Sequence, residues 1–218
     1  MKTGFIFAGV LAALAACGPL HTVSPIEGLV RGAVSGALGD DSASGTPAAA
    51  APLTRAAIEA ADRDLLRISL IEREATALLS LAATNGTKAT WFTSDGLSFT
   101  FDRGVLVGTR GLGADVLGSD VDGAVAAMRR GGNYARTLDF LDGLDQIERR
   151  VYQCVSVRTG EETITIFERS YRTAVVEETC TGETEAFKNT YWRDSAGTIW
   201  QSRQWISPTA GFLGYQRL

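Results

Sequence analysis

Histidine is almost missing from this sequence of 218 residues, in which the only example, His21, stands close to the N-terminus. A serine or cysteine nucleophile activated by histidine, and a zinc site built on histidine, are therefore excluded for the rest of the chain. Cysteine is scarce as well: there are three, and no two have the spacing Cys-x-x-Cys that is typical of redox and metal motifs. The sequence thus predicts no metal, no cofactor and no histidine-based catalysis.

Positive charge is not in excess either. The chain carries 21 lysine and arginine residues against 25 aspartates and glutamates, which is a formal net charge of −4. Nucleic acids and anionic membrane surfaces attract proteins that present a basic surface. The charge balance therefore argues against nucleic acid as a partner and leaves protein or carbohydrate as the macromolecules to consider.

Apolar runs long enough to cross a bilayer are also absent. The apolar run over residues 5–16 falls short of the ~20 residues that a membrane-spanning helix needs. It follows the basic start Met1-Lys2-Thr3 and ends in Leu14-Ala15-Ala16-Cys17, the order of a lipobox: a branched apolar residue, two small residues and a cysteine. We predict that residues 1–16 are a lipoprotein signal peptide and that Cys17 is the lipidated first residue of the mature chain. An ordinary secretory signal is the alternative.

A lipidated Cys17 implies a location. Such a cysteine carries a diacylglyceryl group and an N-acyl chain such as palmitate, and stable anchoring needs more than one chain. The next residue is Gly18, not the aspartate that retains lipoproteins in the inner membrane. We therefore expect a lipid anchor at the periplasmic face of the bacterial outer membrane.

The other two cysteines are expected to form a disulfide. Once Cys17 carries lipid, Cys154 and Cys180 share an oxidising compartment with no other thiol. A bond between them would close a loop of about 26 residues and stabilise the fold by ~3 kcal/mol in the chain-entropy model. A reactive or metal-binding pair is the alternative. The spacing of the two cysteines does not support it, and no histidine lies near either of them in the sequence.

The composition divides the mature chain into two parts. Residues 17–52 are poor in aromatic residues and rich in glycine, alanine, serine and proline, which indicates a lipidated N-terminus followed by a flexible tether. Residues 53–218 hold all four tryptophans and most of the periodic apolar pattern. We predict that they form a single β-rich periplasmic domain.

The pattern within residues 53–218 is mostly that of strands. A helix is expected to begin at Thr54. Leu66, Ile68 and Leu70 alternate with polar residues, Asn85-Gly86 marks a hairpin, and three short strands should form a meander over residues 89–107. Helices are expected over 120–130 and 137–144, followed by strands over 147–157, 163–170, 172–181, 186–192, 198–206 and 214–218. This number of short strands favours a mainly β fold, an antiparallel β-barrel or sandwich with a few short helices.

Two motifs invite a catalytic or phosphate-binding interpretation that their details do not support. The glycine-rich residues 108–113 lack the third glycine of a dinucleotide fingerprint and the Gly-Lys-Ser/Thr of a P-loop, so tight turns explain them better. The doublets Glu161-Glu162 and Glu177-Glu178 put their side chains on opposite faces of a strand, so neither forms a catalytic pair, and we interpret both as solvated. A carboxylate pair brought together by folding, among Asp95, Asp102 and Asp115, remains an alternative.

The tryptophans and their polar neighbours suggest contact with sugars. Aromatic rings stack on sugar rings, while adjacent arginine and glutamine side chains can bond hydroxyl groups; packing in the core is the simpler explanation for most of the tryptophans. The residues 198–206 place mixed side chains on both faces of the expected strand, so periodicity does not say which face is buried. The candidates for glycan or partner contact are Trp91, Arg110, Asp115, Trp192, Trp200, Arg203, Gln204 and Trp205.

Five short motifs, in their order and spacing, resemble a known family. They are Thr90-Trp91, Ser94-Asp95-Gly96, residues 109–115, Asn189-Thr190-Tyr191-Trp192 and Ser202-Arg203-Gln204-Trp205. Together with the lipobox they resemble the YjbF/GfcB family of outer-membrane lipoproteins, which is tied to exopolysaccharide and group 4 capsule production. The resemblance covers most of residues 54–218 and implies a periplasm-facing, mostly antiparallel β lipoprotein with no established catalytic residues.

The leading hypothesis is therefore a non-enzymatic accessory lipoprotein of exopolysaccharide or capsule secretion or assembly. It would bind proteins of the export machinery, or the polysaccharide itself, while held at the outer membrane. A carbohydrate-binding module and a polysaccharide-modifying enzyme with a carboxylate pair are the two alternatives.

Overall fold

The computed structural model describes residues 53–141, 144 and 146–218. The predicted lipobox with Cys17 and the predicted tether lie outside the described residues. The strands are β1 (Leu65–Leu70), β2 (Ala75–Asn85), β3 (Lys88–Phe92), β4 (Ser98–Asp102), β5 (Val105–Arg110), β6 (Val116–Asp120), β7 (Gly132–Leu141), β8 (Ile147–Ile166), β9 (Arg169–Thr181), β10 (Ala186–Arg193), β11 (Ile199–Ser207) and β12 (Gly211–Arg217). The helices are α2 (Arg55–Ala60), the 3-10 turn η1 (Ile71–Arg73) and α3 (Asp122–Arg130).

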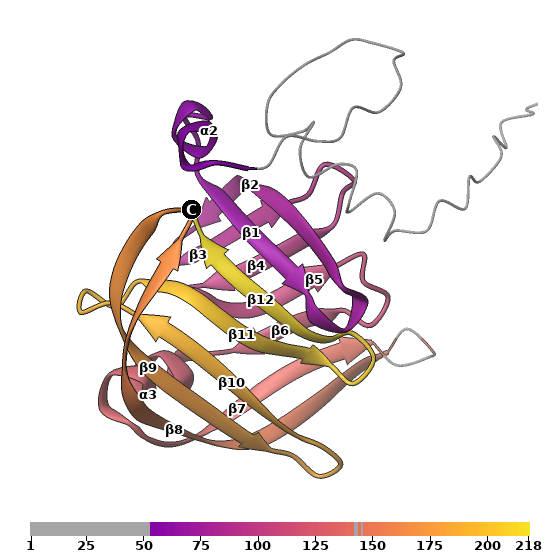
Figure 1. Ribbon diagram of the computed structural model, residues 1–218. Coiled ribbons are helices and arrows are strands. Elements are labelled where there is room, and N and C mark those ends of the chain that lie inside the picture. Colours follow the sequence, from indigo (N-terminus) through magenta and orange to yellow (C-terminus); the bar gives the residue numbers. More distant parts are fainter. Residues whose placement is uncertain (1–52, 142–143, 145) are drawn as a thin grey trace, which may run out of the picture.

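All twelve strands belong to one antiparallel sheet in the order β5-β4-β3-β2-β1-β12-β11-β10-β9-β8-β7-β6. The sheet curls until its two edge strands, β5 and β6, lie side by side, so that it forms a nearly closed barrel (Figure 1). The loop between Arg110 and Val116 connects these edges, and the Val116 amide donates to Thr109 Oγ1 at 3.1 Å. The predicted fold class, mainly antiparallel β with a few short helices, is confirmed.

The barrel is filled by the inward faces of its strands. Leu66, Ile68 and Leu70 of β1 are buried at every second position, as their alternation predicts, and Phe99 and Phe101 of β4 are buried as well. Aromatic side chains complete the core toward β10 and β11, where the rings of Phe187 and Trp205 stack at a centroid distance of 4.5 Å.

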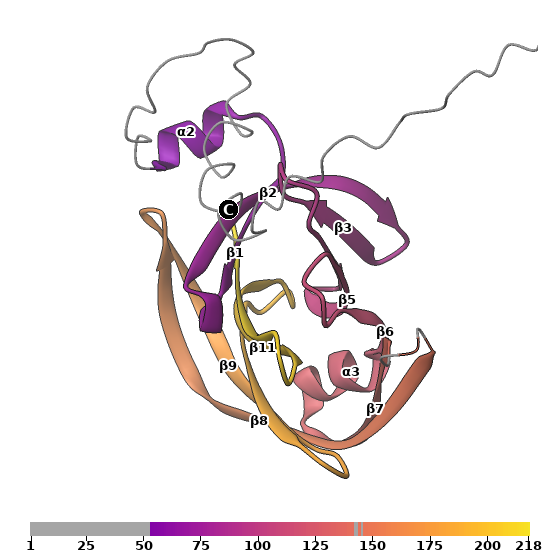
Figure 2. The same ribbon diagram turned by 90° about the vertical axis from the view of Figure 1, so that its right-hand side faces the viewer.

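Both α-helices occur where the sequence predicts them. Thr54 Oγ1 accepts from the Ala57 amide at 3.2 Å and so caps α2. Arg129 and Arg130 lie in the last turn of α3, which Gly131 ends with a φ of 72°. Figure 2 shows α3 on the concave side of β7 and β8, with Ala124 and Met128 in the core. Among the described residues, no helix is long and apolar enough to span a membrane.

The hairpin and the meander are confirmed. Asn85 pairs with Lys88 across a two-residue turn that begins at Gly86, whose φ is 60°. The strands β3, β4 and β5 then follow one another as antiparallel neighbours.

Three expectations about the strands were wrong. Residues 137–141 of the expected second helix belong to β7, because Arg136, Leu138 and Phe140 are buried at a period of two. The expected strands 147–157 and 163–170 are largely one strand, β8, since Thr159-Gly160 marks a shift of register and not a turn. The turn lies at Phe167-Glu168, and both residues have a positive φ. Strand β6 was not predicted.

Candidate functional site

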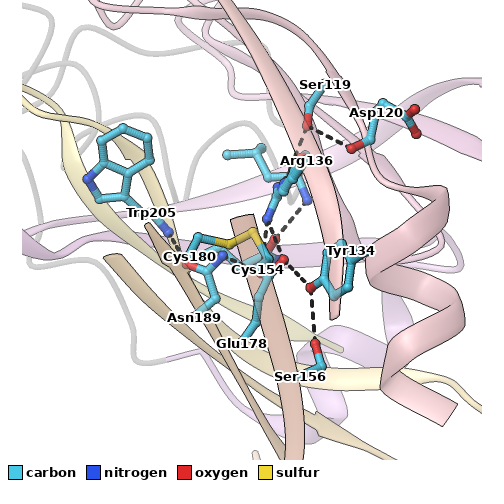
Figure 3. The surroundings of a disulfide bond; sticks show 12 residues. Ser119, Asp120, Tyr134, Arg136, Cys154, Ser156, Glu178, Cys180, Asn189 and Trp205 are labelled. Carbon is cyan, nitrogen blue, oxygen red and sulfur yellow. Dashed lines mark hydrogen bonds and ion pairs between the residues drawn. A yellow bond between two sulfur atoms is a disulfide. The ribbon is translucent and has the colours of Figure 1, made fainter. Parts of the chain in front are cut away.

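An ion pair lies in the middle of the barrel. Arg136 of β7 and Glu178 of β9 point toward each other, and Nη1 of the arginine lies 2.9 Å from Oε2 and 3.2 Å from Oε1 of the carboxylate (Figure 3). The side chains are 2% and 0% exposed. Arg136 Nη2 also donates to the carbonyl oxygen of Leu106 in β5, at 3.2 Å. The pair therefore connects three strands across the interior.

Three further donors surround the same carboxylate. Tyr134 donates to Glu178 Oε1 at 2.6 Å, while Asn189 and Tyr191 donate to Oε2 at 2.7 and 2.8 Å. Burial alone would raise the pKa of Glu178, but Arg136 and these hydrogen bonds outweigh it and lower the pKa. Glu178 is thus ionised, fully bonded and inaccessible. The interpretation of Glu178 as a solvated residue was wrong, because Arg136 supplies an internal partner that the local sequence does not reveal.

We call Arg136, Glu178, Tyr134, Asn189 and Tyr191 the interior network. Its tyrosines do not act as bases, because burial first, and the charge of Glu178 second, raise their pKa values. The atoms are enclosed by strands and already satisfied, so the network can position backbone but offers no free group for chemistry.

Gln204 extends this positioning role. The side chain is fully buried; its Oε1 accepts from the Leu106 amide at 2.8 Å and its Nε2 donates to the Gly104 carbonyl oxygen at 2.9 Å. Together with Arg136 it bonds the backbone of β5, an edge strand, from the inside. Asn189 Oδ1 in turn accepts from the Trp205 amide at 2.7 Å. These polar side chains therefore fix the position of β5 relative to β7 and β11.

The disulfide lies beside this network. Cys154 and Cys180 are directly paired in the register of β8 and β9 and are bonded to each other, as predicted (Figure 3). Their sulfur atoms and a Glu178 oxygen lie within 4.8 Å of one another, a spacing that a metal site could use. Because the sulfurs are bonded and the carboxylate is paired with Arg136, these three residues do not offer free ligands.

Three of the eight predicted contact residues are in the core. Trp91 and Trp205 are 6% and 7% exposed, and Gln204 bonds β5. Packing and internal hydrogen bonds account for them. Trp200 is half-buried; its ring stacks on Tyr171 at a centroid distance of 3.9 Å and its Nε1 donates to Asp194 Oδ2 at 2.9 Å.

Two others organise the glycine-rich loop. Asp115 accepts from the amides of Gly111 and Leu112 at 2.9 and 3.2 Å, so the chain's own carboxylate occupies the donors that a phosphate would need. Arg110 Nη1 donates to the Val116 carbonyl oxygen at 3.0 Å. Gly111 and Gly113 have φ values of 95° and 90°, as expected for tight turns.

The aspartates of the enzyme alternative have separate local roles. Asp102 accepts from Arg103 Nε at 2.9 Å, and Arg103 also forms an ion pair with Asp122. Burial would raise the pKa of Asp102, yet the hydrogen bond from Arg103 and other bonds lower it. Asp115 stabilises the glycine-rich loop, and Asp95 is exposed in the turn after β3. Each is explained by its turn or ion pair.

Trp192 and Arg203 lie together beside one hollow at the surface. A groove of about 270 Å³ runs over the outer faces of β1, β12, β11 and β10. Trp192 Nε1 donates to Glu162 Oε2 at 2.7 Å, and the Arg203 guanidinium lies 3.4 Å from the centroid of the Phe212 ring. We call this hollow the outer groove; its lining includes Arg67, Ser69, Trp192, Gln201, Arg203, Gly214 and Gln216.

A further hollow was not predicted from the sequence. It measures about 720 Å³, lies beside the C-terminal end of α3 and is lined by side chains of β8, β9 and β10. We call it the arginine pocket after the arginines in its lining: Arg129, Arg130, Arg158, Arg172 and Arg193. These residues are spread over 65 positions of the chain, and no local motif marks them. Only the pairing of the strands brings them together.

Comparisons with known proteins agree with this fold. The family model described as "Group 4 capsule polysaccharide lipoprotein gfcB, YjbF" matches residues 31–218, so the match begins within the predicted tether. No curated protein matches the chain. Among solved structures, the crystal structure of the hypothetical lipoprotein YmcC from Escherichia coli K12 is similar: the TM-score is 0.65 at 20% sequence identity, over 74% of this chain and 86% of that one. At that identity the likeness concerns the fold. The family match spans most of the sequence, and the chain therefore belongs to the YjbF family of group 4 capsule polysaccharide lipoproteins.

Proposed function

We propose that the protein is a non-enzymatic accessory lipoprotein that acts in the secretion or assembly of exopolysaccharide or capsule. Lipid on Cys17 holds it at the periplasmic face of the outer membrane, the tether of residues 17–52 follows, and residues 53–218 form one domain that binds export proteins or the polymer. The family match over residues 31–218 carries this proposal. The lipobox Leu14-Ala15-Ala16-Cys17 supports the anchor.

The carboxyl groups with a clearly shifted pKa lack the raised value that a catalytic acid needs. Hydrolysis by a carboxylate pair needs one carboxylic acid whose pKa is raised, so that it can donate a proton. Partial or complete burial alone would raise the pKa of the five carboxyl groups named next, but hydrogen bonds and arginine charges outweigh it. Among the described residues, the carboxyl groups whose pKa departs clearly from its usual value all have a lowered pKa: Asp102, Asp139, Glu178, Glu185 and Asp194.

A deletion strain tests the role in the pathway. Loss of the protein should reduce polysaccharide outside the cell, and the wild-type chain should restore it. The variant Cys17→Ser should appear in the soluble periplasmic fraction and restore less polymer, because it lacks the anchor. Unchanged polysaccharide in the deletion strain would refute the pathway role, and Cys17→Ser that still sediments with the outer membrane would refute the anchor.

Purification from membranes distinguishes the two kinds of partner. The lipidated wild-type chain, solubilised in detergent, should bring down either proteins of the export machinery or polysaccharide. Proteins identified by mass spectrometry after chemical cross-linking would support the first kind of partner, and sugar released by acid hydrolysis the second. Recovery of neither from cells that export polymer would contradict a binding role.

The outer groove supports a second candidate function, a carbohydrate-binding module. Arg67 Nη1 donates to Gln216 Oε1 at 2.8 Å and Gln216 Nε2 donates to Gln201 Oε1 at 2.9 Å, which forms a row of amide and guanidinium groups beside Trp192. Gly214 leaves the floor without a side chain. An aromatic ring next to such groups is the usual means of holding a sugar.

Tryptophan fluorescence tests this second function. Titration of the full chain with oligosaccharides of its own polymer should change the fluorescence, and Trp192→Phe should remove that change. Trp91→Phe, in the core, is the matched control and should leave it in place. Identical changes in both variants, or no change in the wild type, would exclude sugar binding at the outer groove.

A further inference from the structure

The arginine pocket continues the inner face of the barrel beyond its packed core. Ser156 of β8 pairs with Glu178 and is buried, and the next residue of the same face, Arg158, pairs with the core residue Val176. On β10 the buried Tyr191 is followed on the same face by Arg193, which pairs with Ala174 of β9. The inward faces of three strands therefore lead directly into the pocket, and the end of α3 forms its other side.

The charges of the pocket do not balance. The lining contains five arginines and two acids, Glu161 and Asp194, in a chain whose net charge is −4. Glu161 forms an ion pair with Arg158. Asp194 is held in its own turn, where it accepts from the amides of Gly197 and Thr198 at 2.8 and 2.9 Å. The other four arginines of the lining therefore form no ion pair with either of these two acids.

Several guanidinium groups in the pocket are free. Those of Arg129, Arg130 and Arg172 form no hydrogen bond or ion pair with the residues that the structure describes. Arg193 Nη1 donates to the Met128 carbonyl oxygen at 3.1 Å, with no ion pair among the same residues. Burial first, and the charge of Arg129 second, lower the pKa of Arg193. Like charges thus face one another in a half-enclosed space.

Helix capping explains only part of this arrangement. Arg129 and Arg130 complement the negative end of the α3 dipole, as cations in a last turn generally do. Arg158 and Arg172 belong to β8 and β9, outside the helix. A hollow that gathers uncompensated guanidinium groups from several elements is an arrangement that an anion stabilises.

We propose that the arginine pocket binds the carboxylate groups of an acidic polysaccharide, in the manner of uronic acid residues. This inference rests on the proposed function and assigns the pocket as the point of contact with the polymer. The planar guanidinium group forms paired hydrogen bonds with a carboxylate. The volume of about 720 Å³ lies within the range of sites for small ligands, so the pocket can take a short segment of a chain.

The lining favours a sugar over a lipid. Met128 and Val157 are the only large apolar side chains among the described residues that line the pocket, which is little surface for acyl chains. Gly131 and Gly132 contribute backbone to the lining, and Ser195 contributes a hydroxyl group. A hydrated, polar ligand with separated negative charges matches these groups.

The direct test is binding of tetragalacturonate to the full lipidated chain in detergent, measured by calorimetry. The pocket variant is Arg158→Gln combined with Arg172→Gln. The matched control is Lys88→Gln combined with Arg217→Gln, which removes the same charge from exposed positions elsewhere. We expect the pocket variant to bind at least about tenfold more weakly than the wild type, and the control to bind within about twofold.

The remaining arms distinguish other ligands. Neutral galactotetraose should not bind at the pocket, and added salt should weaken tetragalacturonate binding. Equal loss in the pocket and control variants would overturn the proposal, since it would indicate unspecific attraction. Binding of polyglutamate, or of vesicles that contain phosphatidylglycerol, that depends on the pocket while tetragalacturonate does not bind would overturn it in favour of protein or lipid. A deletion strain with normal polysaccharide would refute the proposed function whatever the binding result.

Discussion

Arg136 and three arginines of the pocket, Arg158, Arg172 and Arg193, lie on the inner face of the same sheet, but their surroundings differ. Arg136 faces one carboxylate, Glu178, which also accepts hydrogen bonds from three neutral donors. Burial alone would lower the pKa of Arg136, but the charge of Glu178 outweighs it and raises the pKa. At Arg193 the opposite occurs: burial and the nearby Arg129 lower the pKa. The charge of Arg136 is therefore neutralised by a partner within the protein, whereas the charge of Arg193 is not.

This difference distinguishes an arginine that stabilises the fold from arginines that are proposed to bind a ligand. A buried arginine is tolerated only with its partner, because leaving either charge unpaired in the interior is costly. The pocket arginines remain near solvent, where repulsion between like charges is screened and can be relieved by a ligand.

Breaking the interior network should produce the largest effect. The substitution Arg136→Met leaves the Glu178 carboxylate buried and unpaired, and should lower the free energy of unfolding by about 3–5 kcal/mol. Urea denaturation followed by circular dichroism measures this change. The matched control is Arg149→Gln, which breaks a cross-strand pair with Asp139 on the exposed side of the same sheet. A loss at Arg136 no larger than the loss at Arg149 would contradict the structural role.

Removal of the disulfide should produce the second largest loss of stability. Replacing both Cys154 and Cys180 by alanine should reduce the free energy of unfolding by ~3 kcal/mol, because the unfolded chain regains the freedom of the closed loop. Denaturation with and without reducing agent should give the same difference for the wild type. Mass mapping without reduction should find the two cysteines joined; two free thiols in periplasmic material would show that the bond does not form in the cell.

Acid should weaken the interior network in a defined range. The pKa of Glu178 is lowered in the folded chain from its usual value of 4.5, because Arg136 and the hydrogen bonds outweigh burial. Its contribution to stability is therefore complete above that value and is lost as the pH falls through the lower folded pKa. Urea midpoints measured downward from about pH 6 should fall less steeply for Glu178→Gln than for the wild type. Parallel profiles would contradict the assignment.

Removing charge from the pocket should have the smallest effect on stability. Arg158→Gln combined with Arg172→Gln should change the free energy of unfolding by no more than about 0.5 kcal/mol, since both side chains are exposed. Thermal unfolding of the full chain measures it. A large loss would mean that these arginines hold the fold together as Arg136 does, and the contrast between the two regions would fail.

Local patterns predicted most of the fold. The alternation of Leu66, Ile68 and Leu70, the turn at Asn85-Gly86 and the cap at Thr54 each depend on neighbours in the sequence, and each is confirmed. The errors arose where distant residues decide. Residues 137–141 are helix-compatible taken alone, but they pair with β8 over their whole length. Thr159-Gly160 has the composition of a turn, yet β8 pairs with β9 on both sides of it, so the strand continues with only a shift of register.

The candidate sites followed the same division. The sequence identified Trp192 and Arg203 as candidate contacts, and the structure places both at a surface hollow. It also identified Gln204, which is buried. The sequence around a polar residue beside aromatic residues does not show whether its side chain faces solvent or the interior. The partner of Glu178 lies 42 positions away in the chain, so its burial could not be foreseen.

Certain features of this protein were determined by the sequence alone. The predicted lipobox, the pairing of the two cysteines, the family and the antiparallel class all follow from short motifs, counts and periodicity, because these depend on residue type and near neighbours. Tertiary structure alone decided which arginine is neutralised and which ones face an open pocket. The interaction between two charges depends on their separation in space. The curled sheet sets these separations, because it brings together residues that are far apart in the sequence.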